Sequence, residues 1–421
     1  MSVYALVDCD HFYVSCQRLF DPALEKRPVV VLSNNDGCVI SRSPEAKKLG
    51  IPMGAPYFKY RRLCEQNKVV VFSSNYELYG DLSQRVMTSL RQFCPDIEVY
   101  SIDEAFLRLD GFSHLDLTDY CTKIAGKIKM WTGIPVSIGI GPSKTLAKAA
   151  THLAKKNYQE KVFDLRNPSV QDSVLAQIDV NDVWGIGHRL TQKLTRLGIT
   201  TAQQLRDSPT NQIRQKFGVM VERTLLELNG IACFSLETDQ PKKTIISSRS
   251  FGHPVNQLTE LEEAISHFAA IACAKLRKQQ SKTHSIYVFL QTNLFSLRET
   301  PYSNGIMHGF AEPCAHTDAV IQAAKKILKQ IFIPGLGYKK AGVMLMNIIP
   351  AARRQHDLFI DPCSQDKKNH LMQVIDTIND RMGRDSIFMA AEGVHRSWRM
   401  QANLKTASFT THWHDILTID I

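Results

Sequence analysis

Two strand patterns that end in carboxylates constrain the fold of this chain more than any other feature. The run Val3–Val7 is apolar, is too short to cross a membrane and suits a buried strand, and Asp8 follows it directly. A second pattern of strand, turn and strand surrounds Tyr100–Glu104, with Asp103 and Glu104 side by side at the turn. Asp and Glu are almost never buried without a partner, so acids at the ends of central strands need cations to hold them together. We therefore expect an α/β unit whose sheet brings the three acids to one edge.

The adjacent acids also have a simpler explanation. Successive side chains of a regular strand point to opposite faces, so both can serve one site only if the backbone turns or bulges there. Two solvated carboxylates in a hairpin are the commoner explanation of an Asp-Glu pair, and the buried strand that ends at Asp8 argues against it. Oxygen ligands with no Cys/His spacing nearby favour Mg²⁺, with Mn²⁺ as a substitute. Two such ions about 3.5–4 Å apart are the usual arrangement for phosphoryl transfer by in-line displacement.

Composition and charge indicate a globular protein with a polyanionic partner. The 421 residues suffice for two to four domains, and 44% hydrophobic with 22% charged residues is typical of globular proteins. The formal net charge is +10, and all of the excess lies before Arg353. The ten cysteines include no Cys-x-x-Cys pair, and we find neither a secretion-signal pattern nor a transmembrane stretch. We expect reduced thiols, a cytoplasmic location and no membrane partner.

Strand and helix signals alternate over the first 165 residues. Asp10 is expected to cap a helix that runs to Phe20. Ser43, Pro44 and Gly50 are the expected cap, first residue and left-handed stop of a short helix. The other elements expected here are strands over 28–33, 38–41, 69–72 and 136–140, and helices over 76–93 and 119–131.

A helix expected over 143–155 carries a stripe of lysines. At 100° per residue, Lys144, Lys148 and Lys155 fall within about 40° of one another. A lysine stripe is usually a solvated face, and that alternative stays open. Because the helix follows a strand that pairs into the acidic sheet, its lysines are also placed to compensate triphosphate charge, and Lys155 is the best candidate.

The sequence Gly185-Ile186-Gly187 predicts a phosphate-binding hairpin. Glycines let the backbone approach closely, and amides at the N-terminus of the following helix can bind a DNA phosphate without reading sequence. A plain turn between helices is the alternative, since glycine ends many helices and this is not the longer dinucleotide fingerprint.

From about Pro241 the order of signals becomes β-α-β-β-α-β, which predicts a ferredoxin-like domain. Its strands are expected at 244–251, 285–292, about 307–310 and 341–348, and its helices at 258–278 and 319–332. A basic linker, Gln240–Lys243, precedes it. Arg249 and the pair Lys339-Lys340 are candidates to follow a nucleic-acid backbone, with scattered surface charge as the alternative.

The residues after Pro350 give weaker signals. Leu358 and Phe359 are adjacent large apolar residues in a polar stretch, which is typical of a short docking peptide. Packing of these two residues onto their own domain is the alternative. Residues 366–382 are expected to be helical, and His412 with His414 is not taken as a metal site.

These motifs, in this order, resemble the Y-family of translesion DNA polymerases and, within it, the bacterial UmuC type. The motifs are Asp8–Tyr13, Ser101–Glu104, Ser143–Lys148, Gly185–Gly187 and Ser248–Gly252, and together they span about 350 residues. Asn34–Ile40 and Ser73–Tyr79 resemble the UmuC branch in particular, as does the long tail.

The resemblance implies a multidomain α/β (α+β) chain with the right-hand polymerase architecture. A ferredoxin-like palm with small fingers is expected over 1–165, and a helical thumb with a helix-hairpin-helix over 166–240. A ferredoxin-like little finger that binds DNA is expected over 241–350. Residues 351–421 would hold a clamp-binding motif and a partner-binding tail.

The resemblance also implies the roles of site residues. Asp8, Asp103 and Glu104 match the family's catalytic metal ligands, with the Cys9 backbone carbonyl as a further ligand of two Mg²⁺ ions. The ions would lower the pKa of the primer 3′-hydroxyl and hold the deoxynucleoside triphosphate for in-line addition of one nucleotide. Tyr13 matches the steric gate that meets a ribose 2′-hydroxyl, with ordinary aromatic packing as the alternative. The nucleotide-binding set is completed by Phe12, Lys47 and Lys155, and the DNA-binding set is Gly185, Gly187 and Arg249.

One position departs from the wider family. Pro44 and Lys47 stand where many members place Tyr and Arg on the triphosphate, so a point charge replaces a bidentate grip. The stretch 355–359 resembles the family's sliding-clamp motif through Gln355, Leu358 and Phe359. The tail resembles the region through which UmuC-type subunits meet a UmuD′-type dimer and the RecA filament during SOS mutagenesis.

Three functions follow from these patterns. The first is an error-prone polymerase that extends primer-template DNA past damaged bases in a bacterial cytoplasm. The second is a non-catalytic DNA-binding scaffold of the same fold, against which the intact acid triad argues. The third is a nucleotide cyclase, which would need neither the thumb hairpin nor a second basic domain.

Overall fold

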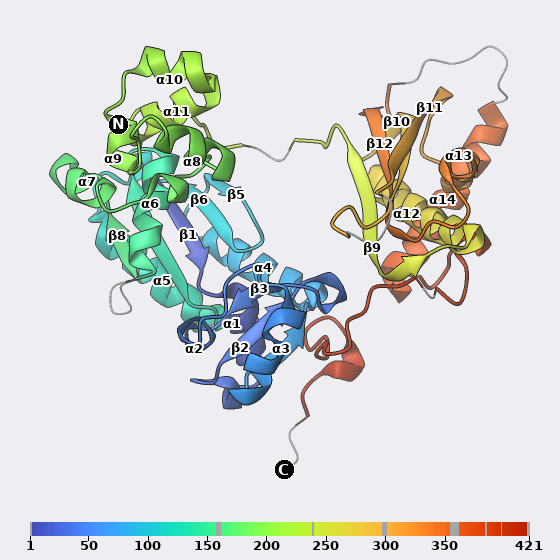
Figure 1. Ribbon diagram of the computed structural model, residues 1–421, viewed down its shortest axis with the longest axis horizontal. Coiled ribbons are helices and arrows are strands. Elements are labelled where there is room, and N and C mark those ends of the chain that lie inside the picture. The colour runs from blue at the N-terminus through green and yellow to red at the C-terminus, as the bar shows by residue number, and fades with distance from the viewer. Residues whose placement is uncertain are drawn as a thin grey trace. The chain divides into compact units, whose positions relative to one another are not determined.

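The computed structural model describes residues 2–156, 161–237, 240–296, 301–353, 362–383, 385–396 and 398–418. The chain forms two compact units, and most of their helices and strands are labelled in Figure 1. The first comprises Met1–Ser33, Gly37–Thr238 and Leu404–Ile421, and the second comprises Asn34–Asp36 and Asp239–Asn403. The C-terminal segment from Leu404 therefore folds with the N-terminal unit.

A five-stranded sheet in the order β5-β6-β1-β7-β8 forms the centre of the first unit. Its strands are β5 (Ile97–Val99), β6 (Glu104–Arg108), β1 (Tyr4–Cys9), β7 (Val136–Gly141) and β8 (Val162–Asp164). The central strand, β1, is buried over its whole length and runs antiparallel to both neighbours. The buried strand predicted at Val3–Val7 is confirmed.

The two faces of this sheet are covered by different helices. Side chains alternate along β1, so Ala5 and Val7 join the core of one face and Leu6 that of the other. The first face is covered by α1 (Phe12–Phe20), α4 (Tyr76–Leu90) and α5 (Leu117–Thr132), and the second by α6 (Lys144–Ala154). Asp8 is two residues after Leu6, so its side chain points to the same face of the sheet, which is the face covered by α6.

The close approach of α6 to the sheet depends on glycines in β7. A Cβ atom on Gly139 would lie 2.1 Å from the Thr151 amide nitrogen, and one on Gly141 would lie 2.6 Å from the Ala147 nitrogen. The helix therefore packs directly on the backbone of β7. Ser143 caps it by accepting a hydrogen bond from the Leu146 amide, as the predicted helix start requires.

A smaller sheet in the order β3-β2-β4 accompanies the first. Its strands are β2 (Val29–Leu32), β3 (Val39–Arg42) and β4 (Val70–Ser73), and its helices are α2 (Pro44–Lys48) and α3 (Tyr57–Gln66). Ser43 caps α2 through the Ala46 amide, and Gly50 follows it at φ +78°, both as predicted. The sequence patterns do not predict α3, because Cys64 is its one fully buried residue and the rest of its apolar face, Tyr57, Tyr60 and Leu63, is only partly buried.

Short helices complete the first unit. They are α7 (Pro168–Leu175), α8 (His188–Thr195), α9 (Ala202–Arg206), α10 (Thr210–Phe217) and α11 (Val219–Leu228). Their apolar faces form a core that also contains Leu146 and Ala150 of α6. One helix, α6, therefore joins the sheet to this helical cluster.

The second unit confirms the predicted β-α-β-β-α-β order. The elements are β9 (Ile245–Val255), α12 (Leu258–Lys278), β10 (Ser281–Gln291), β11 (Ser303–Cys314), α13 (Thr317–Ile331) and β12 (Tyr338–Pro350). The sheet has the order β11-β10-β12-β9, and α12 and α13 pack on it around one apolar core. A further helix, α14 (Pro362–Met382), confirms the helix predicted in the tail. Within the described parts of the chain, no helix is long and apolar enough to cross a membrane.

Candidate active site

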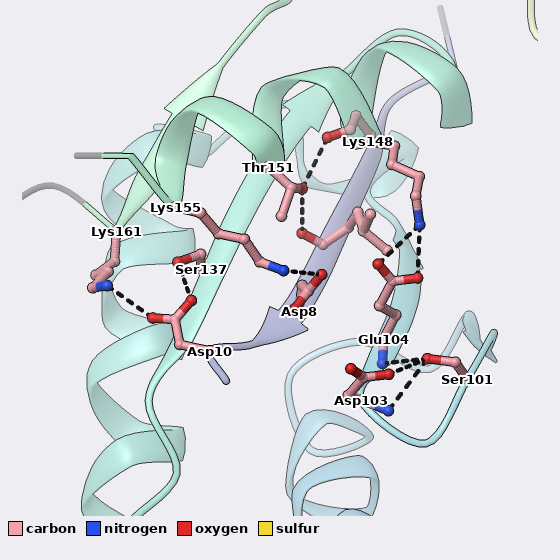
Figure 2. Close-up of polar contacts among 12 residues, drawn as sticks. Asp8, Asp10, Ser101, Asp103, Glu104, Ser137, Lys148, Thr151, Lys155 and Lys161 are labelled. Atoms are coloured by element: carbon pink, nitrogen blue, oxygen red, sulfur yellow. Dashed lines mark hydrogen bonds and ion pairs between the residues drawn. The ribbon is translucent and has the colours of Figure 1, made fainter. Parts of the chain in front are cut away.

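The pairing of β1 with β6 places Asp8 directly opposite Glu104. Residues paired across antiparallel strands share a face of the sheet. Asp103 is the last residue of the turn before β6, and its carbonyl accepts a hydrogen bond of 2.8 Å from the Cys9 amide. Because Asp103 lies before the regular strand, the rule that successive side chains point to opposite faces does not force Asp103 and Glu104 apart. Figure 2 shows the three acids near the ends of these two strands.

Two lysines from the α6 stripe hold these acids. The Nζ atom of Lys155 lies 2.5 Å from Asp8 Oδ2, and that of Lys148 donates to both carboxylate oxygens of Glu104, at 2.7 and 2.8 Å (Figure 2). The stripe is therefore partly exposed but is not merely a solvated face, because both lysines pair with the acids. Lys144 has a different partner, since its ammonium is buried against Glu98 on β5.

The Asp8 carboxyl is strongly perturbed. Burial, reinforced by Glu104 and opposed by Lys155, raises the pKa of Asp8 to about 8. Its Oδ1 atom is buried and has no hydrogen-bond partner among the described residues. Burial also acts on Glu104, but the hydrogen bond from Asp8 and the charge of Lys148 outweigh it and lower the pKa of that carboxyl. The two shifts have opposite directions, so this acidic pair binds a proton more readily at Asp8 than at Glu104.

This donor set fits a hard divalent cation. The ligand atoms are oxygens, and a cation beside Asp8 Oδ1 would supply the missing partner and take the place of a proton bound at Asp8. The Cys9 side chain packs with Ala5 and Val7 in the core on the face of the sheet opposite Asp8, so it is not placed to be a ligand. Only the Cys9 backbone carbonyl remains to contribute.

The three acids do not yet form a closed ligand set. Among the described residues, the one group of three ligand atoms that all lie within 4.8 Å of one another is His267, Asp385 and Glu392, in the second unit. That group already holds a cation, because the Arg396 guanidinium pairs with Asp385 at 2.7 Å and with Glu392 at 3.5 Å. In the first unit, Lys148 and Lys155 draw Glu104 and Asp8 toward α6 instead of toward Asp103.

Ser101 orders the acidic turn. Its hydroxyl donates to Asp103 Oδ1 at 2.6 Å and accepts from the amides of Asp103 and Glu104, at 3.3 and 3.0 Å. Ser101 was expected only as part of the motif Ser101–Glu104, with no role of its own. A Ser two residues before an Asp is nonetheless the usual signal for such local side-chain bonding.

A cleft of about 440 Å³ opens beside the acids, within the size range of small-molecule sites. It is lined by Cys9, His11, Phe12, Tyr13, Ile40, Ser41, Met53, Tyr76, Asp103 and Lys155. The structure thus brings three of the expected nucleotide-binding residues, Phe12, Tyr13 and Lys155, into one cleft with Asp103.

The ring of Tyr13 is held by two other tyrosines. It stacks on Tyr79 at a centroid distance of 4.5 Å and meets the edge of Tyr76 at 6.2 Å. Tyr79 is in turn fixed by a hydrogen bond of 2.7 Å from Gln17. Burial raises the pKa of Tyr13 to about 12, so its phenol stays neutral at physiological pH.

Asp10 does not cap α1, contrary to the prediction. The cap position is held by His11 in the left-handed region at φ 47°, with no side-chain capping bond. The Asp10 carboxylate instead accepts from Ser137 Oγ and Lys161 Nζ, each at 2.8 Å (Figure 2). The left-handed turn lets His11 line the cleft, which sequence spacing does not reveal.

The remaining predicted site residues are not among the residues that line this cleft. Lys47 is on α2 and does not line the cleft. The pKa of the His152 imidazole is lowered mainly by burial, and the charge of Lys47 adds a smaller contribution. Gly185 has φ +87°, and Gly187 is the cap residue of α8, which begins without a side-chain cap. Arg249 lies on the edge strand β9, opposite Ala341, and donates to the Ser248 carbonyl at 2.8 Å. The expected clamp-binding residues Gln355, Leu358 and Phe359 fall outside the described residues.

Three family models match this chain. Residues 7–152 match the impB/mucB/samB family, residues 242–358 match its C-terminal domain, and residues 369–419 match a domain of unknown function. The Salmonella typhimurium protein UmuC is 42% identical over 421 residues, which cover 99% of this chain and 100% of that protein. DNA polymerase IV of Dehalococcoides mccartyi is 32% identical over 287 residues, 67% of this chain and 72% of that enzyme.

Solved structures confirm the right-hand fold. A Y-family DNA polymerase chimera matches with a TM-score of 0.67 and 22% identity over 83% of this chain and 99% of its own. DinB from Sulfolobus solfataricus matches with a TM-score of 0.53 at the same identity and coverage. At this identity the likeness concerns the fold alone.

Proposed function

Because this chain belongs to the impB/mucB/samB family, within the Y-family DNA polymerases, we propose that it is a DNA-directed DNA polymerase that extends primers past damaged template bases. The observation that carries the proposal is the buried Asp8 carboxyl, whose unpartnered Oδ1 lies in a cluster of acids beside a cleft of nucleotide size. A non-catalytic scaffold has no need for such a carboxyl, which is costly to bury.

The acids are proposed to hold two Mg²⁺ ions, with Mn²⁺ as a substitute. Asp8, Asp103, Glu104 and the Cys9 backbone carbonyl would be the ligands. When bound, these ions supply a lowered pKa for the primer 3′-hydroxyl and compensation of the charge on the triphosphate and the leaving pyrophosphate.

The lysines of α6 would then serve the nucleotide. Lys155 and Lys148 pair with Asp8 and Glu104 in this structure. A bound triphosphate offers each ammonium an alternative anionic partner, and Lys155 already lines the cleft. Lys47 would add a more distant point charge from α2.

Tyr13 is proposed to select the sugar. A ring held between neighbours cannot move aside cheaply, so it would exclude a ribose 2′-hydroxyl by contact. Phe12 packs beside it, with ring centroids 5.6 Å apart, and would form the floor of the sugar site.

The domain assignments and partners extend this proposal. Residues 1–165 would act as palm and fingers, 166–240 as thumb, 241–350 as little finger and 351–421 as the partner-binding tail. Template DNA would be held at its phosphates by the amides near Gly185 and Gly187 and by Arg249. Gln355, Leu358 and Phe359 would bind the sliding clamp, and the tail would meet a UmuD′-type dimer and the RecA filament during SOS mutagenesis in the bacterial cytoplasm.

The test is primer extension with Mg²⁺ on an undamaged template and on one with an abasic site, with and without clamp and accessory proteins. Asp103→Asn should abolish extension while leaving affinity for primer-template DNA near that of the wild type. Asp10→Asn is the matched control, because Asp10 is paired with Lys161 and lies outside the proposed ligand set. Extension retained in Asp103→Asn rules out the metal site, and no wild-type extension under any condition favours the scaffold.

A further inference from the structure

The motif Ser73–Tyr79, which resembles the UmuC branch in particular, is the docking site of the C-terminal segment. The Ser73 amide donates to the Leu404 carbonyl at 3.0 Å, and the Leu404 amide donates back to Ser73 Oγ at 2.9 Å. Glu77 pairs with Lys405 at 3.1 Å and accepts from Ser408 Oγ at 3.4 Å. The segment 404–409, called the strap below, lies inside the match to the domain of unknown function.

Asn75 joins the strap to the start of α4. Its side chain is fully buried, and its Nδ2 donates to the carbonyls of Thr406 and Ala407, at 3.0 and 3.2 Å. Its Oδ1 accepts from the Leu78 amide and so caps α4. One amide group therefore begins the helix with its oxygen and holds the strap with its nitrogen.

The strap also contacts the helix that carries Tyr13. The ring of Phe409 stacks on Phe20 at a centroid distance of 4.7 Å, and Phe20 is the last residue of α1. Phe409 also packs against the core of the first unit. The strap is thus attached to both α1 and α4, the two helices that hold Tyr13.

The first turn of α4 leads directly to the cleft. It carries Tyr76, which lines the cleft, and Tyr79, on which the Tyr13 ring stacks. Gln17 of α1 binds the Tyr79 hydroxyl and ties the two helices together. Asn75 directly precedes Tyr76 in the sequence. Loss of the strap is therefore expected to shift Tyr76 and Tyr79, the two rings that contact Tyr13.

We propose that the strap, through Asn75, positions Tyr76, Tyr79 and hence Tyr13, and thereby sets how strongly the enzyme rejects ribonucleotides. This inference rests on the proposed role of Tyr13 as the gate against the 2′-hydroxyl. It assigns Asn75 and the strap as positioning elements, since none of them reaches the substrate cleft.

The substitution Asn75→Asp tests the inference in the full-length chain. Aspartate keeps the oxygen that caps α4, because Asp caps helices as well as Asn does. Its second carboxylate oxygen replaces the Nδ2 donor and faces the Thr406 and Ala407 carbonyls. Because an ionised carboxylate cannot donate to a carbonyl and repels it, the strap should be released at pH 8. Phe409→Ala is a second variant, which weakens the same docking from the α1 side. Lys405→Ala is the control, because its ion pair with Glu77 is solvent-exposed and contributes little.

Two measurements decide the outcome. Hydrogen exchange of the Ser73 and Leu404 amides should be faster in Asn75→Asp and Phe409→Ala than in the wild type and Lys405→Ala. The ratio of ribonucleotide to deoxyribonucleotide incorporation should rise about tenfold in both docking variants, on the scale of one or two lost buried hydrogen bonds. In a Tyr13→Ala background, Asn75→Asp should add nothing further to that ratio, because the effect passes through Tyr13.

The result separates this inference from the function on which it rests. A wild-type chain that extends no primer overturns the proposed function and this inference together. Sugar selectivity that survives release of the strap in an active polymerase overturns this inference alone. Ser73 and Leu404 amides that exchange freely in the wild type also overturn it and favour a tail that serves only external partners.

Discussion

Asp8 and Lys155 form an ion pair, with Nζ and Oδ2 2.5 Å apart, at the end of a strand that is buried over its whole length. The other oxygen of Asp8 has no partner among the described residues. The lysine therefore compensates only part of the cost of burying this carboxyl, which is why burial still raises the pKa of Asp8 to about 8. The first two predictions follow from that imbalance.

The stability of the metal-free protein should fall as pH rises because of Asp8. Its pKa is about 8 in the folded chain and about 3.9 when unfolded, so the folded state binds the proton more tightly. The stabilising contribution is complete below pH about 4 and is lost as pH rises through about 8. Asp8→Asn should remove this part of the pH dependence, measured as the free energy of unfolding in urea with EDTA at pH 5, 7 and 9. An unchanged pH dependence would contradict the assignment.

Affinity for Mg²⁺ should rise with pH and level off near pH 8. Metal ligands must be deprotonated, so binding at Asp8 releases a proton, and the apparent Kd should fall up to about tenfold per pH unit between pH 6 and 8. Calorimetric titration in two buffers of different ionisation enthalpy would measure both the Kd and the proton release. Asp10→Asn should behave as the wild type, and Asp103→Asn should weaken binding. A Kd independent of pH would place the cation elsewhere.

Breaking the buried pair Lys144–Glu98 should destabilise the first unit strongly. The two groups lie 2.5 Å apart with side chains 2% and 9% exposed, and they also bind the Ser235 carbonyl and the Glu237 amide. Lys144→Met leaves Glu98 buried without a counter-charge, which typically costs about 3–5 kcal/mol.

The matched control for that prediction is the exposed pair Arg61–Glu65, whose side chains are 69% and 61% exposed. Arg61→Ala should change the free energy of unfolding by less than about 1 kcal/mol. Denaturant unfolding of both variants makes the comparison. Equal effects would mean that Glu98 finds another partner when Lys144 is lost.

Gly139→Ala should separate α6 from the sheet. The new Cβ would meet the Thr151 amide nitrogen at 2.1 Å, and backbone on both sides cannot yield, so a cost of about 3 kcal/mol or more is expected. Gly126→Ala in α5 is the control, because its Cβ meets nothing within 4 Å and alanine favours a helix by up to about 1 kcal/mol. Thermal unfolding should show a lower Tm for the first variant and an equal or higher Tm for the second. A stable Gly139→Ala would show that α6 can shift outward.

Local patterns were sufficient for most of the elements. The buried run before Asp8, the cap of α2 at Ser43 and the β-α-β-β-α-β order of the second unit all follow from signals only a few residues long. The acids of the candidate site were predicted for the same reason, since Asp8 ends one strand pattern and Asp103 and Glu104 lie between two others. The helix α3 was not predicted, because only Cys64 is fully buried in it and its stripe is too weak to read.

What the sequence by itself determined is therefore which residues carry charge at strand ends and which segments form strands or helices. Only the tertiary structure decided how those charges are paired. Lys155 and Lys148 lie on one predicted stripe with Lys144, yet the register of α6 on the sheet takes Lys144 to Glu98 and the other two to the acids. Likewise, Asn75 and Thr406 are 331 residues apart and meet through the buried side chain that begins α4. Local propensity depends on neighbours in sequence, whereas burial and ion pairing depend on neighbours in space, which only the folded chain provides.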